Sequence, residues 1–214
     1  MDKTIIDDAI AYVKDIFQND HSGHDYFHTL RVYKMATHIA EQENADLLIV
    51  QLSALLHDVD DIKLSPETYA NKDRAAAFLR EHGCPESTIS MICDLIDEVS
   101  FRGTDSVVPK TMEGKCVQDA DRLDAIGAIG IARAFTYGGS HDRILYDPEI
   151  KPVMNMNGDE YRNHISTTIN HFYEKLFQLK DMMNTDAAKK IAEQREQYMK
   201  EYITEFLDEW DGIR

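Results

Sequence analysis

Apolar residues recur along most of the chain with the spacing of an amphipathic α-helix. Ile6, Ile10, Val13 and Phe17 mark one face of a first helix, and Leu30 belongs to the apolar face of a second. The same period predicts further helices over residues 45–57, 71–80, 86–100, 112–135, 161–183 and 185–210. No segment combines two-residue alternation with the turn signals of a β-hairpin. The pattern therefore predicts an all-α protein.

Two stretches interrupt the helical pattern. Residues 101–111 are expected to form a loop, and residues 136–160 combine a Gly138-Gly139 pair with aromatic and charged residues. Loops of that length in compact domains are more often lids or binding loops than plain connections. A variable surface insertion is the alternative interpretation of residues 136–160.

Length and charge limit the classes of partner. A chain of 214 residues with 43% hydrophobic content can bury a sizeable core. Its net charge of −16 repels a phosphate backbone, so we expect no nucleic-acid polymer as a partner. A small phosphorylated molecule needs only a local cationic pocket, which some of the 23 Lys and Arg residues can supply.

The sequence also predicts a cytoplasmic protein that does not contact a membrane. The first 17 residues carry acids among their apolar positions and lack the apolar core of a signal peptide. No run approaches the ~18 apolar residues of a membrane span. The three cysteines show no CxxC spacing, which suits a reducing compartment.

Three segments carry residues suited to metal binding. SALLHDVDD, residues 53–61, runs an apolar helical segment into His57 and Asp58, where an unpaired buried carboxylate would be costly without a metal ion. FHTLRV places His28 on a helix, and DADRLD places Asp121 and Asp124 on one helix face. Imidazoles combined with carboxylates suit a borderline or hard divalent ion.

The order and context of these motifs resemble the HD superfamily of metal-dependent phosphohydrolases. FHTLRV is similar to the segment that carries the family's first histidine, LLHDVDD to its His-Asp pair, and QDADRLDAIG to its last aspartate motif. The resemblance implies four metal ligands, which are His28, His57, Asp58 and Asp121. Asp124 is then either an ion-pair partner within its helix or a residue with a direct role in the site.

The resemblance also implies an architecture. We expect an HD-domain helical bundle with a C-terminal helical extension, forming a single domain over residues 1–214. Its motif core spans about residues 20–135, followed by the loop and C-terminal helices of residues 136–214. The C-terminal half is similar to a stand-alone bacterial branch of the superfamily, some members of which split nucleoside triphosphates into monophosphate and pyrophosphate.

One metal ion is expected rather than two. Two-metal members of the family place further histidines between the doublet and the last aspartate, whereas only His82 lies there in this sequence, in a segment that predicts a helix end. Four protein ligands leave two octahedral positions for water and a phosphate oxygen. Mn²⁺ is favoured, and Mg²⁺, Co²⁺, Ni²⁺, Fe²⁺ or Zn²⁺ are compatible with the same ligands.

Two acids compete for the role of proton carrier. Asp61 follows Asp58 by three residues, which is the spacing at which some relatives place a catalytic acid, and Asp60 is its competitor. Both could instead simply solvate the turn after the helix. For phosphate contacts, cationic residues within or beside the motif elements are favoured over other charged residues. They are Arg31, Lys63, Arg102, Arg122 and Lys175.

The expected function is hydrolysis of a small phosphorylated substrate. The favoured reaction cleaves a (deoxy)nucleoside triphosphate at the α-phosphate, with the loop of residues 137–160 covering the base or sugar. A nucleotidase or an alarmone hydrolase is the alternative within enzymes, and a non-catalytic nucleotide-binding helical module is the alternative outside them. Base preference, the physiological metal, biological role and oligomeric state are open at this point.

Overall fold

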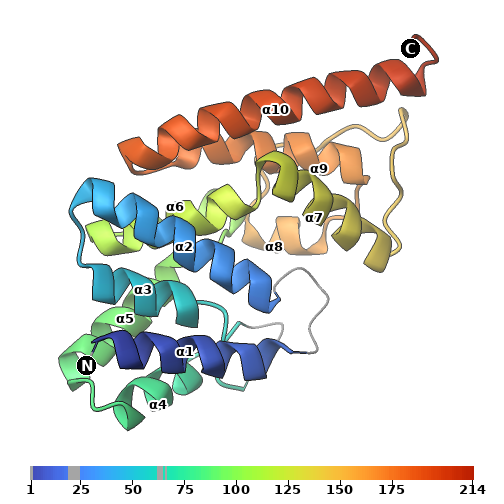
Figure 1. Cartoon of the computed structure of the whole chain (residues 1–214). Coiled ribbons are helices and arrows are strands. Elements are labelled where there is room, and N and C mark those ends of the chain that lie inside the picture. Colours follow the sequence, from blue (N-terminus) through green and yellow to red (C-terminus); the bar gives the residue numbers. More distant parts are fainter. Residues whose placement is uncertain (1, 19–24, 62–64, 66) are drawn as a thin grey trace. The chain divides into compact units, whose positions relative to one another are not determined.

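The computed structural model describes residues 2–18, 25–61, 65 and 67–214, and helices account for most of them. The described part contains ten α-helices, two 3-10 helices and no strand, which confirms the all-α prediction (Figure 1). The α-helices are α1 (Asp2–Phe17), α2 (Tyr26–Glu43), α3 (Leu47–Leu56), α4 (Asp73–Glu81), α5 (Glu86–Val99), α6 (Met112–Asp124), α7 (Gly127–Ser140), α8 (Gly158–Asn163), α9 (Thr168–Glu174) and α10 (Asp186–Trp210). The 3-10 helices are η1 (Gly103–Asp105) and η2 (Leu176–Met182).

The chain forms two compact units. The first consists of Met1–Phe101 with Val107–Asp121, and the second of Arg102–Ser106 with Arg122–Arg214. The single domain over residues 1–214 stays a prediction. None of the described helices is long and apolar enough to cross a membrane.

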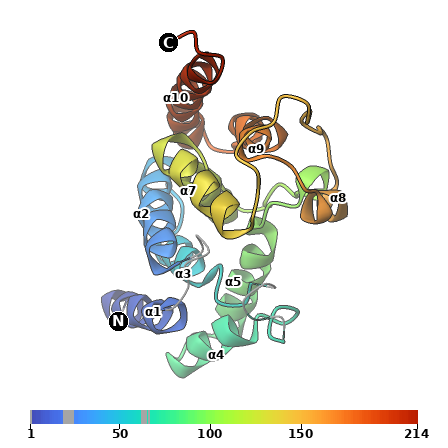
Figure 2. The ribbon, with the colours of Figure 1, turned by 90° about the vertical axis from the view of Figure 1, so that its right-hand side faces the viewer.

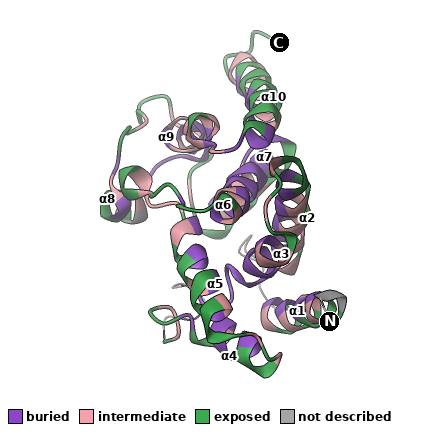
Figure 3. Ribbon diagram, turned by 90° about the vertical axis from the view of Figure 1, so that its left-hand side faces the viewer, coloured by how far each residue is buried: buried purple, intermediate pink, exposed green. Residues whose placement is uncertain are grey.

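The first unit is built around α3. Helix α3 contacts α1, α2 and α5, and its segment from Val50 to Leu56 is buried except for Gln51 (Figure 3). In two views α3 lies between α2 and α1 (Figure 1, Figure 2). Asp46 caps the helix by accepting hydrogen bonds from the backbone N–H groups of Leu48 and Ile49. Because α3 is capped and buried, the position of the residues at its C-terminal end is fixed.

Helix α2 is capped at both ends. The Asp25 side chain accepts a hydrogen bond from the His28 N–H at 2.7 Å, and Asn44 ends the helix in the left-handed conformation with φ 55°. The buried face of α2 includes His28, Val32 and Ala36. The first histidine of the sequence motif therefore sits in the first turn of a helix whose start is fixed by its own cap.

The second unit packs α7 against α10 and α9. Phe172 of α9 is fully buried, and its ring lies near those of Phe135, Phe177 and Tyr202. Thr185 caps α10 by accepting a hydrogen bond from the Ala188 N–H at 3.2 Å. The predicted helix over residues 185–210 is confirmed with this cap at its start.

The single helix predicted over residues 112–135 is wrong. The chain turns after α6, and Gly127 starts α7 with φ +77°, in the left-handed region that favours glycine. A Cβ at Gly127 would lie 2.9 Å from Arg195 Cγ, and a Cβ at Gly130 would lie 2.2 Å from the Ala125 carbonyl oxygen. Both glycines are therefore needed for the break between α6 and α7. The sequence does not show this break, because its apolar period continues through it.

Three further segments differ from the sequence prediction. Helix α7 continues through Ser140 and α8 starts at Gly158, so the long non-helical stretch is residues 141–157 rather than 136–160. The helix predicted over residues 161–183 is divided into α8, α9 and η2. The loop predicted over residues 101–111 holds the short η1.

Candidate metal centre

His57 and Asp58 leave the buried end of α3 in a tight turn. His57 is the C-terminal cap residue, and its ring nitrogen Nδ1 lies 2.9 Å from the Ala54 carbonyl oxygen. Because a carbonyl only accepts, this contact assigns the proton of a neutral imidazole to Nδ1. The other nitrogen, Nε2, then presents a lone pair, which is the arrangement of a metal-ligating histidine.

His28, His57, Asp58 and Asp121 come together within the first unit. His28 Nε2 lies 3.4 Å from Asp58 Oδ2 and 3.5 Å from Asp121 Oδ1. His57 Nε2 lies 3.2 Å from Asp58 Oδ2 and 4.0 Å from Asp121 Oδ1. Three elements of the chain, namely the start of α2, the end of α3 and the end of α6, thus direct nitrogen and oxygen atoms at one point.

The distances within this cluster fit a shared cation. Two donors that are each about 2.1 Å from one ion lie about 3.0 Å apart at right angles and about 4.2 Å apart when opposite. The four imidazole–carboxylate separations, from 3.2 to 4.0 Å, fall between these limits. Within the described residues, the set whose ligand atoms all lie within 4.8 Å of one another is His28, His57 and Asp58, and Asp121 lies beside this set through its distances to the two histidines.

Burial makes a positive charge necessary in this cluster. His28 is fully buried, and His57 and Asp58 are 8% and 6% exposed. Burial alone would lower the pKa of His57, but the carboxylates of Asp58 and Asp121 and the Ala54 carbonyl outweigh it and raise the pKa to about 9. Without a metal, the site therefore holds a proton on His57 to balance its carboxylates, and a divalent ion would replace that proton.

Asp60 and Asp61 occupy different environments although they are neighbours. Asp60 is 1% exposed, and its carboxylate accepts the backbone N–H groups of Arg74 at 3.1 Å and Ala75 at 2.9 Å. It therefore caps the first turn of α4. Asp61 is only half-buried, and its backbone N–H returns to the Asp58 carbonyl at 3.0 Å. This arrangement favours a structural role for Asp60, and Asp61 is the more exposed of the two residues.

The predicted phosphate-binding residues are spread over both units. Arg31 follows His28 by one turn of α2 in the first unit, and Lys63 lies outside the described residues. Arg102, Arg122 and Lys175 belong to the second unit. Arg122 is 3% exposed and donates a hydrogen bond to the Met182 carbonyl, whereas the Lys175 ammonium lies 5.4 Å from the centre of the Tyr161 ring.

Other polar residues of the motifs have structural partners. Asp124 Oδ2 accepts a hydrogen bond from Arg133 Nη1 at 2.8 Å, as expected of an ion-pair partner. His82 ends α4, as predicted, with its ring stacked on Phe78 and its Nε2 3.4 Å from an Asp8 oxygen. His24, which precedes His28 by four residues, lies outside the described residues.

The second unit contains a cavity that sequence reasoning did not identify. Its volume is about 400 Å³, and it lies between the end of α7, the following loop and the segment before α9. Its lining includes Tyr137, His141, Arg143, His164 and Ile165. The sequence indicated a functional loop in this region, but nothing in the pattern showed that these residues share one cavity.

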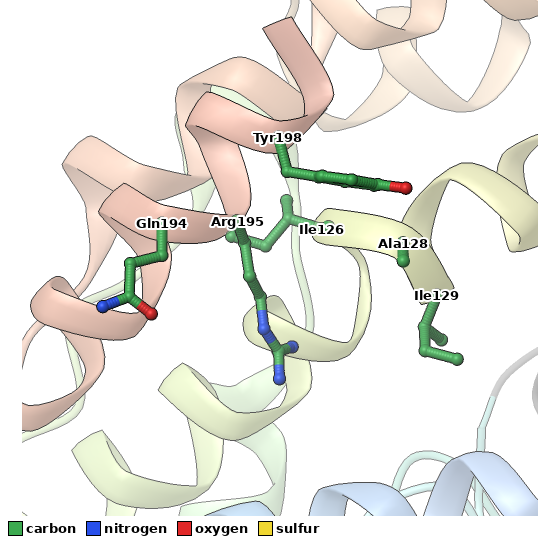
Figure 4. Close-up of a pocket in the computed structure, with 7 residues that line it drawn as sticks. Ile126, Ala128, Ile129, Gln194, Arg195 and Tyr198 are labelled. Atoms are coloured by element: carbon green, nitrogen blue, oxygen red, sulfur yellow. The ribbon is translucent and has the colours of Figure 1, made fainter. Parts of the chain in front are cut away.

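A second cavity, of about 310 Å³, lies where α10 meets the start of α7 (Figure 4). The Tyr198 ring extends toward the first turn of α7, while the Arg195 side chain points toward the end of α6. Arg195 donates a hydrogen bond to the Leu123 carbonyl there, and burial lowers the pKa of its guanidinium. Arg195 therefore closes the C-terminal end of α6 while it lines this cavity.

Comparison with known proteins identifies the family. The family described as HD domain matches residues 25–126, a range that contains all four members of the histidine and aspartate cluster. The Bacillus subtilis protein YpgQ is 38% identical over 205 residues, which cover 95% of this chain and 92% of YpgQ.

Solved structures agree over the whole chain. A Lactobacillus plantarum protein of 40% identity matches with a TM-score of 0.87, covering 98% of each chain. An HD-superfamily hydrolase from Bacillus thuringiensis, 42% identical, gives a TM-score of 0.78 and covers 99% of each chain. The crystal structure of YpgQ in complex with ADP gives a TM-score of 0.77 at 37% identity, covering 98% of this chain and 100% of that one.

Proposed function

Because the chain belongs to the HD-domain family and has the fold of an HD-superfamily hydrolase, we propose that it hydrolyses small nucleotides with one divalent metal ion. The observation that carries this proposal is the proximity of two imidazole nitrogens to two carboxylates, with imidazole–carboxylate separations of 3.2–4.0 Å. That YpgQ binds ADP supports a nucleotide as the ligand. The proposed ligands are His28, His57, Asp58 and Asp121, and Mn²⁺ is the proposed ion.

Each proposed ligand has a defined task. The Ala54 carbonyl fixes the His57 tautomer, so that Nε2 faces the cluster. Asp58 and Asp121 supply the negative charge that attracts a cation to a buried point, where an uncompensated carboxylate would be costly. When bound, the metal would act as a Lewis acid on a phosphate oxygen and lower the pKa of an attacking water.

Asp61 is the proposed proton carrier. Its carboxyl is half-buried, three residues beyond Asp58, whereas both oxygens of Asp60 accept N–H groups of α4. An acid that assists an attacking water must be able to exchange its proton with that water. Arg31, one turn after His28, is proposed to contact phosphate from the same unit, and Lys63, Arg102, Arg122 and Lys175 remain proposals for further contacts.

The favoured reaction is cleavage of a (deoxy)nucleoside triphosphate to a monophosphate and pyrophosphate in the cytoplasm. A panel of nucleoside tri-, di- and monophosphates and an alarmone nucleotide, assayed with Mn²⁺, Mg²⁺ and Co²⁺, tests it. We expect pyrophosphate as the inorganic product. Orthophosphate without pyrophosphate would instead identify a nucleotidase, and nucleotide binding without turnover under every metal would identify a binding module.

Two variants separate metal binding from proton transfer. Asp58→Ala leaves two imidazoles and one carboxylate, so metal affinity should fall by orders of magnitude and turnover should disappear. Asp61→Asn leaves all four proposed ligands in place, so metal content should persist while kcat falls by ~10²-fold or more. Elemental analysis beside kcat for both proteins is the measurement. Retained metal with full activity in Asp58→Ala would overturn the proposed centre.

A further inference from the structure

Hydrogen bonds to α9 fix the loop that lines the cavity beside the end of α7. The Thr168 and Ile169 N–H groups donate to the carbonyls of Ile144 and Leu145 at 2.9 and 3.2 Å, and Asn170 Nδ2 donates to the Ile150 carbonyl at 2.8 Å. Figure 2 shows the loop after α7 passing beside α9. The loop is therefore fastened to a helix at two separate points, and these hydrogen bonds hold the backbone around the cavity.

The buried Glu174 connects α9 to the segments that carry Val153, His164 and Ser166. Its side chain is 3% exposed, and Oε1 lies 3.1 Å from His164 Nε2 while accepting hydrogen bonds from Ser166 Oγ at 2.8 Å and Val153 N at 3.1 Å. The single carboxylate oxygen thus joins three segments around the cavity. These donors satisfy the hydrogen-bonding capacity of Oε1, so Glu174 acts as a structural link between the segments.

Arg143 is the cationic group of the lining. It lies 5.7 Å from the centre of the Tyr137 ring, which also stacks on His141 at 3.9 Å between ring centres. Within the part of the chain that the structure describes, its guanidinium pairs with no carboxylate, including that of Asp142 in the same lining. An arginine that forms no salt bridge beside a cavity is available to bind an anionic ligand.

Lys175 is a second cation in this region, and both Lys175 and Arg143 act on the neighbouring His171. Burial lowers the pKa of His171 to about 3, and the positive charges of Lys175 and Arg143 act in the same direction. His171 is therefore neutral at physiological pH, and it cannot offset the negative charge of a ligand. Arg143 is left to do so, with Lys175 nearby.

We propose that this cavity binds a nucleotide, with its phosphate on Arg143 and its base against the aromatic and apolar side chains of Tyr137, His141, Ile150 and Ile165. The volume of about 400 Å³ is in the range of small-molecule sites. Arginine recognises phosphate through paired N–H donors, and flat bases pack on aromatic rings. The choice of a nucleotide among aromatic anions rests on the proposed function, whereas the site shares no residue with the metal centre.

ADP binding to the full chain after metal removal with EDTA tests the proposal. We expect saturable binding by calorimetry, weakened at least tenfold by Arg143→Met and by Tyr137→Leu. Tyr137→Phe, which keeps the ring, should bind like the natural protein. Lys151→Met removes one positive charge from an exposed position of the same loop outside the cavity, and it should leave affinity unchanged. Circular dichroism establishes that each variant is folded.

The outcomes separate this site from the proposed function. ADP binding that persists in metal-free Asp58→Ala and falls with Arg143→Met supports the cavity, whether or not the protein turns over any nucleotide. Loss of all ADP binding on metal removal, or an affinity indifferent to both Arg143→Met and Tyr137→Leu, overturns the cavity and leaves the metal centre untouched. Full competition by pyrophosphate with none by adenosine would reduce the site to a simple anion site and overturn the assignment of the base.

Discussion

Asp60→Ala should destabilise the first unit rather than remove the chemistry. Asp60 is 1% exposed, and its two carboxylate oxygens accept the N–H groups of Arg74 and Ala75 at 3.1 and 2.9 Å. Hydrogen bonds to charged groups contribute about 1.5–3 kcal/mol each, and loss of a helix cap typically costs about 1 kcal/mol. Water can reach part of the opened helix end, so the expected loss is about 2–4 kcal/mol of unfolding free energy.

Urea unfolding followed by circular dichroism in EDTA measures this loss without any contribution from metal binding. Asp60→Asn keeps one acceptor oxygen and should lose about half as much. Asp73→Ala is the matched control, because Asp73 is an exposed acid in the first turn of the same helix. Its removal should cost only ~0.3–1 kcal/mol, through the helix dipole.

The kinetic result distinguishes the two neighbouring acids. At a temperature where Asp60→Ala is folded, its kcat should stay within a few-fold of the natural protein, whereas Asp61→Asn should lose ~10²-fold. An Asp60→Ala protein of unchanged stability and no turnover would refute the capping role. That result would assign the role of proton carrier to Asp60 instead of Asp61.

The remaining predictions concern His57 and the break between α6 and α7. Since the folded pKa of His57 is raised to about 9, its stabilising contribution in metal-free protein is complete below pH ~6.5 and is lost as the pH rises through about 9. Urea midpoints should fall over that window and Asp58→Asn should flatten the fall, while Mn²⁺ affinity, measured by calorimetry, should increase as the proton leaves. Gly127→Ala should cost ~1–3 kcal/mol in thermal unfolding, because a Cβ there meets Arg195 Cγ at 2.9 Å with φ +77°. Gly139→Ala, with no atom within 4 Å of its added Cβ, should cost nothing, and equal losses in both variants would contradict the steric explanation.

The sequence was sufficient where local signals agree with burial. Asp46 and Thr185 stand directly before apolar-periodic segments, and both cap the helices that follow them. The three segments of the proposed metal centre were found in the same way, because each combines metal-binding residue types with a helical context. Each of these signals occupies a few consecutive residues, so it is visible in the sequence alone.

The failures of sequence reasoning arise from contacts between distant segments. The apolar period runs through residues 125–130, and only the approach of Arg195 from α10 shows why Gly127 must be glycine. The cavity lining was missed for the same reason, since Tyr137 and Ile165 belong to segments that come together where α9 donates hydrogen bonds to the Ile144 and Leu145 carbonyls. Periodicity records which face of a helix is apolar, but not where a partner interrupts it.

The turn after α3 shows how adjacent acids acquire different roles. The Val59 N–H returns to the Leu56 carbonyl at 3.3 Å and the Asp61 N–H to the Asp58 carbonyl at 3.0 Å, so the backbone folds back within a few residues. Asp58 then faces the imidazoles, while Asp60 is held by the start of α4. Because the same short turn carries a proposed ligand and the cap of α4, the position of Asp58 depends on the docking of α4. A loosened cap should therefore weaken metal affinity even though Asp60 touches no metal, and Mn²⁺ titration of Asp60→Asn, compared with Asp73→Ala, measures that coupling.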